Sequence, residues 1–227
     1  MNKILDKVNL LRSINFNNIS KDQLEAQLPL LGMNNEILKE FPEKLYKYCN
    51  GSGLRFWQYP NQFSSYLKFL SQLEVDSYLE IGCRWGGTFV IVAEALRQRN
   101  VNITLYACDV IEMSEVLKQY SSIQNFYYFE KSSFELQPKD FVNHKADLVF
   151  IDGSHRYRDV EKDFNLALSL DAKYIVFHDI SSTACPQSTD HWQQLKQRYA
   201  NQCTFYEFTD QYDSVPNNYL GIGVMQR

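Results

Sequence analysis

Glycine is scarce in this 227-residue chain, which has nine glycines where average usage of roughly 7% would give about 16. Three of the nine fall within six residues, at Gly82, Gly86 and Gly87. Glycine adopts sharp turns and close backbone approaches that other residues resist. The cluster therefore indicates a backbone requirement at one place in the fold.

An excess of positive charge is also absent. The chain has 23 Lys plus Arg against 27 Asp plus Glu, a net charge of −4, and it contains no Lys/Arg run. Sequence-independent nucleic-acid binding depends mainly on the neutralisation of phosphates by such residues. We therefore predict no nucleic-acid partner, and a small molecule or a protein fits this charge better.

Paired cysteines and long apolar runs are missing too. The five cysteines lie 18 or more residues apart and form no C-x-x-C pair, so neither a disulfide framework nor a zinc knuckle is indicated. Charges interrupt the first sixteen residues, which lack the apolar core of a signal peptide, and no stretch approaches the roughly 18 apolar residues of a membrane span. We predict a cytoplasmic protein with no membrane partner.

Residues 1–70 have a helical pattern. Apolar residues recur at helical spacing from Ile4 to Leu11 and again over residues 37–45. We predict a helical N-terminal extension packed on a main domain of residues 71–227. The apolar helices of this extension also suit a homo-oligomer.

From residue 77 the pattern changes to short apolar runs that alternate with helical stretches. The runs cover residues 78–81, 103–108, 126–129, 147–151 and 174–177, and the helical stretches cover residues 88–97, 112–120, 135–143 and 159–169. This alternation predicts a doubly wound α/β fold with a mostly parallel sheet. After a further helix at residues 192–199, strands at residues 204–209 and 221–225 are joined by too short a link for a crossover, so we expect an antiparallel hairpin.

Polar side chains follow all five of the first runs. They are Glu80 to Thr88, Asp109, Ser132 with Ser133, Asp152 to His155, and His178 with Asp179. Single residues of this kind often cap the next helix. Five such ends together are better explained by a ligand site, because ligands bind beyond the carboxyl ends of the strands in open α/β sheets.

The glycine loop and its acidic surroundings select the type of ligand. Gly82 would let the chain turn off the first strand, and Gly86 and Gly87 would let backbone approach a ligand. The spacing is G-x-x-x-G-G, unlike the G-x-G-x-x-G of dinucleotide enzymes, and the carboxylates at the strand ends would repel a pyrophosphate. They suit a ligand with positive charge and a ribose diol, such as S-adenosylmethionine, with Asp109 placed 22 residues past Gly87 to bind the diol.

Three motifs in order carry a family resemblance. Residues 78–88, Tyr-Leu-Glu-Ile-Gly-Cys-Arg-Trp-Gly-Gly-Thr, resemble motif I of class I S-adenosylmethionine-dependent methyltransferases. Residues 150–157, Phe-Ile-Asp-Gly-Ser-His-Arg-Tyr, and Val176 to Asp179 resemble a subgroup with an I-D-G-x-H-x-Y signature, which includes O-methyltransferases of small molecules, sugars and antibiotics. The resemblance implies a seven-stranded Rossmann-like sheet whose last strand is antiparallel.

The resemblance also implies a set of cofactor-binding residues. They are Gln58, Glu80, Gly82, Cys83, Arg84, Gly86, Gly87, Thr88, Asp109, Val110, Ser132, Ser133, Asp152, Gly153 and His155. Glu80 and Gly82 would lie near the methionine portion, Asp109 at the ribose, and Ser132 or Ser133 near the adenine. Asp152 and Gly153 would border the transferred methyl. Arg84 would pair with the cofactor carboxylate or remain a solvated loop arginine, and Gln58 would close over the methionine end or lie in a linker.

Two acceptor chemistries remain open. In the first, His155 or His178 acts as a general base beside Asp152, because imidazole titrates near neutrality. In the second, Asp152, His178 and Asp179 hold Mg²⁺ or another divalent cation that lowers the pKa of the acceptor hydroxyl. His191 and Trp192 would line the acceptor pocket or belong to the core.

We therefore expect an S-adenosylmethionine-dependent methyltransferase acting on a hydroxyl of a small molecule or sugar. A nicotinamide-dependent oxidoreductase is the first alternative, and the missing G-x-G-x-x-G pattern disfavours it. A non-catalytic relative that keeps the cofactor pocket is the second alternative.

Overall fold

The structure is a computed structural model that describes residues 3–227. Its centre is a seven-stranded sheet in the order β3-β2-β1-β4-β5-β7-β6. The strands are β1 Ser77–Ile81, β2 Thr104–Asp109, β3 Tyr127–Glu130, β4 Leu148–Ile151, β5 Tyr174–His178, β6 Thr204–Phe208 and β7 Ile222–Gln226. The first five strands run parallel, whereas β7 is antiparallel to both β5 and β6. The predicted fold class and the terminal hairpin are both confirmed.

The central strands are buried on both faces, as expected for a parallel sheet covered by helices. Every residue of β1 and β4 is buried. In the β1 register, Ile81 lies opposite Cys108 of β2 on one side and Ile151 of β4 on the other. The polar residues that follow these three strands therefore emerge side by side.

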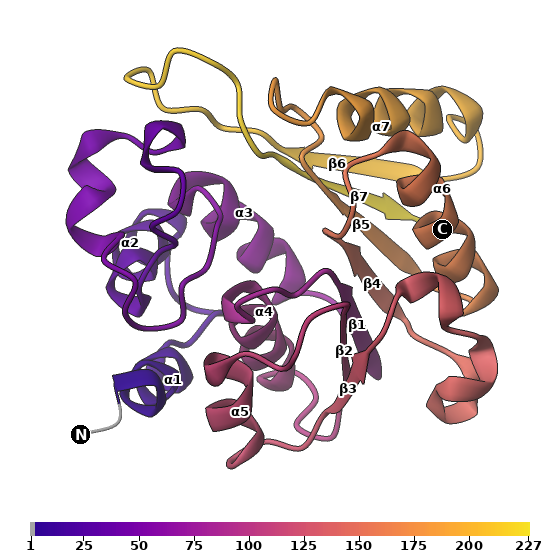
Figure 1. The fold of residues 1–227 in the computed structure, drawn as a ribbon, viewed down its shortest axis with the longest axis horizontal. Helices are drawn as coiled ribbons and strands as arrows, with labels where there is room; N and C mark the ends of the chain where they lie inside the picture. Colours follow the sequence, from indigo (N-terminus) through magenta and orange to yellow (C-terminus); the bar gives the residue numbers. More distant parts are fainter. Residues whose placement is uncertain (1–2) are drawn as a thin grey trace.

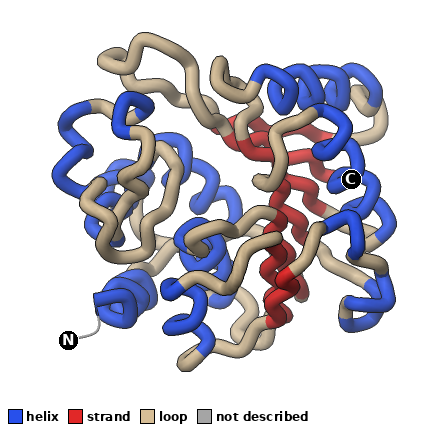
Figure 2. Tube along the Cα trace, viewed as in Figure 1, coloured by secondary structure: helices blue, strands red, loops and turns tan. Residues whose placement is uncertain are grey.

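Helices cover the two faces of the sheet in separate layers (Figures 1 and 2). They are α1 Lys3–Ser13, α2 Lys21–Gln27, α3 Pro60–Leu70, α4 Gly87–Arg97, α5 Glu115–Ser121, α6 Tyr157–Ser169 and α7 Pro186–Arg198. One apolar core lies under α1 to α5 and includes Phe63 and Phe89, and the other lies under α6 and α7 and includes Phe164 and Trp192.

Two predicted helices are wrong. Residues 135–143 form three short 3-10 turns, at Ser133–Glu135, Pro138–Asp140 and Val142–His144, because extended backbone at Leu136, Gln137 and Phe141 separates the turns. The predicted helix over residues 37–45 is likewise replaced by the 3-10 turns Leu38–Glu40 and Glu43–Tyr48, since Pro42 between them cannot continue a helix. A third prediction, residues 192–199, falls inside the longer helix α7.

The N-terminal segment is thus helical at its ends and irregular in its middle. Its turns Leu28–Leu31, Leu38–Glu40 and Glu43–Tyr48 lead into an extended stretch, in which Met33 forms an isolated parallel bridge with Phe56. The segment shares the apolar core of the α1 to α5 layer.

The apolar face of α1 points into the protein. Val8 and Leu11 are fully buried, and α1 packs on α4 and α5. A homo-oligomer built on the N-terminal helices remains a prediction, and it would have to use exposed side chains such as Leu10 and Leu30. Within residues 3–227, no helix has both the length and the apolar character needed to cross a membrane.

Candidate functional site

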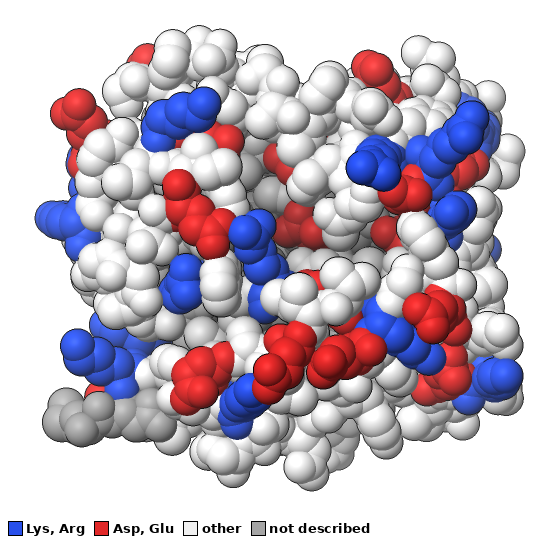
Figure 3. Space-filling view, viewed as in Figure 1, with Lys and Arg blue, Asp and Glu red and all other residues white. Residues whose placement is uncertain are grey.

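A cavity of about 880 Å³ lies at the carboxyl ends of the parallel strands. Figure 3 shows Asp and Glu side chains inside the hollow at the centre of this face, with Lys and Arg side chains beside it. Of the residues proposed from the sequence for the cofactor, catalysis or a metal, all but Gln58 line this cavity. The fold therefore gathers the five polar strand ends into one space.

The glycine loop is shaped mainly by contacts within the protein. Gly82 has a left-handed φ of +84°, and a Cβ there would lie 2.3 Å from the Asp152 carbonyl oxygen, so only glycine fits the turn after β1. A Cβ on Gly86 would lie 2.4 Å from the Leu117 side chain, and one on Gly87 would lie 2.3 Å from the Leu54 carbonyl oxygen. The sequence interpretation of Gly86 and Gly87, a close approach of backbone to a ligand, is therefore incomplete, because both also make room for neighbouring segments of the chain.

Glu80 is a buried carboxyl on the floor of the cavity. It accepts a hydrogen bond from the Tyr78 hydroxyl, and burial raises the pKa of Glu80 to about 8 despite that bond. A carboxyl with this pKa is mainly neutral at pH 7. A cation bound nearby would favour its ionised form.

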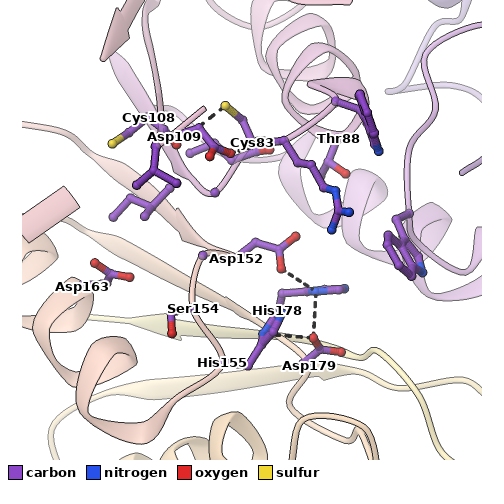
Figure 4. A pocket seen from close by; sticks show the side chains of 18 of the residues that line it. Cys83, Thr88, Cys108, Asp109, Asp152, Ser154, His155, Asp163, His178 and Asp179 are labelled. Atoms are coloured by element: carbon purple, nitrogen blue, oxygen red, sulfur yellow. Dashed lines mark hydrogen bonds and ion pairs between the residues drawn. The ribbon is translucent and has the colours of Figure 1, made fainter. Parts of the chain in front are cut away.

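Asp109 is held in place by backbone donors. Its carboxylate accepts hydrogen bonds from the Arg84 N–H at 2.6 Å and from the Ile111 N–H at 3.3 Å. The side chain lies between the glycine loop and the end of β2 and borders the cavity (Figure 4).

Ser132 and Ser133 follow β3, at another part of the cavity lining. Ser132 caps the next turn by accepting from the Phe134 N–H, and Ser133 donates to Asp163 at 2.6 Å. Burial raises the pKa of Asp163 to about 6. Asp163 is thus a further acidic group of the lining, and its placement on α6 explains why it stood apart from the strand ends in the sequence.

His178 lies between two carboxylates, as Figure 4 shows. Its Nδ1 lies 2.8 Å from Asp152 Oδ1 and 3.5 Å from Asp179 Oδ2. Burial alone lowers the pKa of His178, but Asp152 and Asp179 outweigh it and raise that pKa well above its ordinary value. Burial opposes ionisation of Asp179 as well, yet His178 and His155 hold the pKa of Asp179 below its ordinary range. The two carboxylates therefore favour the protonated form of His178.

Gln58 lies outside the cavity lining, contrary to a direct contact with the methionine end. It is fully buried, and its Oε1 lies 3.1 Å from Nε2 of His178. Its role in this geometry is to hold the inner edge of the His178 ring.

His155 occupies the outer side of the same cluster. Its Nδ1 lies 3.3 Å from Asp179 Oδ2, and its side chain is 44% exposed, whereas that of His178 is 5% exposed. A carboxylate at Nδ1 orients an imidazole so that Nε2 can accept a proton. Of the two histidines proposed as bases, His155 is the one placed to exchange a proton.

Among residues 3–227, two groups of side chains are close enough together to ligate a metal, with ligand atoms within 4.8 Å of one another. One is the predicted set Asp152, His178 and Asp179, and the other is His155, Asp179 and Cys185, which sequence reasoning did not assemble. In the first set, Nδ1 of His178 faces the oxygens of both carboxylates, and this nitrogen would have to be free of a proton to bind a metal. The two carboxylates offer oxygen ligands of the kind that Mg²⁺ prefers.

His191 and Trp192 do not line the cavity. Both are fully buried under α7, where His191 Nε2 lies 2.7 Å from Glu161 Oε2 and the Trp192 indole donates to Glu207. Of the two alternatives for these residues, the core is therefore the one that the structure supports, because α7 turns this face toward the sheet.

A second wall of the cavity comes from the irregular N-terminal segment, which sequence reasoning had not assigned to the site apart from Gln58. It contributes Ile37, Glu40, Arg55 and Trp57. Arg84 of the glycine loop faces this wall and pairs with Glu36 at 2.6 Å. Only the cluster of tryptophan and arginine near the glycine loop could have signalled this wall in the sequence.

Residues 79–180, a little under half of the chain, match the family model Methyltransf_24, described as a methyltransferase domain. The chain carries a methyltransferase domain. This match confirms the predicted class of enzyme, and it covers the segment on which the motif resemblance rests. No curated protein matches the chain.

Several solved structures have a fold similar to that of this chain. An O-methyltransferase from Bacillus cereus, in complex with SAH, is 12% identical with a TM-score of 0.54 and covers 100% of this chain and 92% of its own. The O-methyltransferase TomG from Streptomyces achromogenes, in complex with SAM, is 12% identical with a TM-score of 0.52, covering 92% and 99%. The O-methyltransferase NovP is 12% identical with a TM-score of 0.54, covering 97% of each chain. At these identities the likeness supports the fold alone.

Proposed function

We propose that this protein transfers a methyl group from S-adenosylmethionine to a hydroxyl of a small molecule or sugar. The observation that carries the proposal is the single cavity in which the glycine loop meets Glu80, Asp109 and Asp152. Similar folds in complex with SAM and SAH support the same cofactor. The I-D-G-x-H-x-Y stretch at residues 151–157 supports the O-methyltransferase subgroup.

The charges of the cavity floor match the cofactor's positive end. A sulfonium and an ammonium are stabilised by carboxylates in a partly desolvated site. Glu80 and Asp152 supply these carboxylates, and Asp109 is available to accept hydrogen bonds from the ribose hydroxyls. Ser132 and Ser133 are assigned to the adenine end by the resemblance.

Methyl transfer is a one-step displacement, so alignment and proton removal are the tasks of the protein. As the acceptor oxygen attacks, its bond to the methyl carbon forms, the carbon–sulfur bond breaks, and S-adenosylhomocysteine leaves with the electron pair on sulfur. We assign His155 Nε2 as the base that takes the hydroxyl proton, with Asp179 holding Nδ1. The His178 imidazolium keeps Asp152 and Asp179 in position beside the reacting atoms.

A divalent cation is the alternative to a histidine base for activating the acceptor hydroxyl at this site. The mechanism proposed here pairs both carboxylates with His178 and uses no metal step. Activity in the presence of EDTA should therefore equal activity without it. If EDTA lowered the activity and added Mg²⁺ restored it, a metal would activate the acceptor instead.

Calorimetry and an acceptor screen test the function itself. S-adenosylhomocysteine should bind, and NADH should not. Binding of NADH alone would instead support a nicotinamide-dependent oxidoreductase. A screen with methyl-labelled cofactor over phenols, catechols, sugars and hydroxy acids should find an acceptor, whereas binding without turnover on any of them would favour a non-catalytic relative.

A further inference from the structure

Arg55 enters the cavity from a tightly fixed piece of the N-terminal wall. The Leu54 N–H donates to the Leu31 carbonyl at 2.8 Å, and the Phe56 N–H donates to the Gly32 carbonyl at 3.3 Å. The same two residues press on Gly87, where an added Cβ would lie 2.3 Å from the Leu54 oxygen and 2.6 Å from the Phe56 nitrogen. Arg55 is thereby fixed beside the first turn of α4, with a left-handed φ of 59°.

The guanidinium of Arg55 is positioned but lacks an ionic partner. Its Cζ lies 3.7 Å from the centroid of the Trp85 ring, close enough for a cation–π contact. Its Nη2 contacts Asn35 Oδ1 at 3.3 Å, while its Nε is buried without a hydrogen-bond partner in residues 3–227. Across that same range, no carboxylate forms an ion pair with Arg55, whereas Arg84 already has Glu36.

We propose that Arg55 binds the α-carboxylate of the methionine portion of S-adenosylmethionine. This inference rests on the proposed function, because it adds a residue to the same cofactor site. The acidic floor formed by Glu80, Asp109 and Asp152 stabilises the cofactor's positive groups but would repel its carboxylate. Arg55, on the N-terminal wall of the same cavity, offers that carboxylate a charged fork-shaped donor.

The geometry favours Arg55 over Arg84, the residue expected from the sequence. A guanidinium that is already stacked on an indole loses little further freedom when a ligand binds, so binding costs less conformational entropy. Arg84 would have to release Glu36, and its side chain is 55% exposed, where ionic contacts are weak. The free N–H groups at the start of α4 add a favourable partial positive charge beside Arg55.

The same carboxylate chemistry could come from an acceptor, so the experiment must distinguish the two sources. We would measure the affinity of S-adenosylhomocysteine and of its decarboxylated analogue, S-adenosyl-3-thiopropylamine, which keeps the ammonium and lacks only the carboxylate. Calorimetry would use the full chain, Arg55→Gln, Arg55→Lys and, as the matched control, Arg84→Gln. Thermal melts would verify that each variant is folded.

Arg55→Gln should weaken binding of S-adenosylhomocysteine by about tenfold or more and leave binding of the decarboxylated analogue unchanged. Arg55→Lys should fall between the two, and Arg84→Gln should lose less affinity for S-adenosylhomocysteine than Arg55→Gln does. An equal loss with both ligands, no loss with either, or a larger loss in Arg84→Gln would overturn the assignment and leave Arg55 to an acceptor anion or to the fold. If the parent chain fails to bind S-adenosylhomocysteine at all, the proposed function falls first and this inference falls with it.

Discussion

The two walls of the cavity differ in how they are built and in their charge. The wall formed by the strand ends is acidic and rigid, because Glu80 lies within β1, and Asp152 and Asp179 directly follow β4 and β5, all of them buried strands that pair in register. The N-terminal wall has Arg55 and Trp57 on an irregular stretch held by backbone hydrogen bonds and by contact with the glycine loop.

This difference separates two jobs. A parallel sheet fixes the positions of its strand ends through the hydrogen bonds of neighbouring strands, so it can hold several carboxylates close together at the cost of their mutual repulsion. An irregular segment can vary without disturbing the sheet. The N-terminal wall adds the cation of Arg55, together with the buried Glu40, to the carboxylates of the strand ends, and a cavity with both signs of charge suits a ligand that carries both, as the proposed cofactor does.

The largest effect should come from the acidic wall, at the proposed base. His155→Ala should lower kcat by about 100- to 10,000-fold, because the hydroxyl proton loses its acceptor, while the affinity for S-adenosylhomocysteine stays close to that of the parent. Steady-state kinetics on an acceptor from the screen would measure this. His144→Asn, an exposed histidine in a surface turn, is the control. Full activity in His155→Ala would move the base elsewhere.

The next effect concerns the protonation of Glu80. Its pKa is raised from 4.5 to about 8 by burial, so the stability contributed by the neutral form is complete below about pH 4.5 and is lost as pH rises through 8. Glu80→Gln should remove this dependence and stabilise the unliganded protein by a few kcal/mol at pH 9, and by much less at pH 5. Denaturant unfolding at both pH values would measure the difference. If the free energy of unfolding changed with pH in the same way in both proteins, Glu80 would not be the cause of the pH dependence.

A substitution at Gly87 tests the contact between the two walls. Gly87→Ala should destabilise the protein by about 1–3 kcal/mol, because the new Cβ collides with the backbone that carries Arg55. The control is Gly153→Ala, where an added Cβ would meet its nearest neighbour, Ile81, at 3.4 Å. Unfolding midpoints in urea would compare them. Similar losses in both variants would contradict a special contact between the walls.

The smallest effect is expected at the proposed ribose contact. Asp109→Ala should weaken S-adenosylhomocysteine binding by about tenfold through loss of a hydrogen-bond acceptor. Asp109→Asn, which keeps one acceptor for the Arg84 N–H, should retain more affinity. Glu130→Gln, at the paired position on β3, serves as the calorimetric control. Unchanged affinity in Asp109→Ala would remove this residue from the site.

The strands and most of the acidic wall were predictable from the sequence. Continuous apolar runs such as residues 148–151 and 174–178 have no competing interpretation once they alternate with helices, and the polar residues after them must meet at one edge. The helix predicted at residues 135–143 failed because apolar spacing alone does not register the extended backbone at Leu136 and Gln137, just before Pro138. His191 has a ligand's chemistry but lies fully buried in the core, which only the packing of α7 reveals.

The sequence by itself determined the sheet, the glycine loop and the set of carboxylates, because these depend on local periodicity and on the alternation of strands and helices. Tertiary structure decided which groups lie together. It places His178 beside the Asp152 carboxylate, Gln58 against the other side of the His178 ring, and the backbone around Arg55 against Gly87. These contacts join residues far apart in the chain. Burial and the distances between side chains determine the charge states of the groups in the site, and neither can be read from the spacing of residues along a sequence.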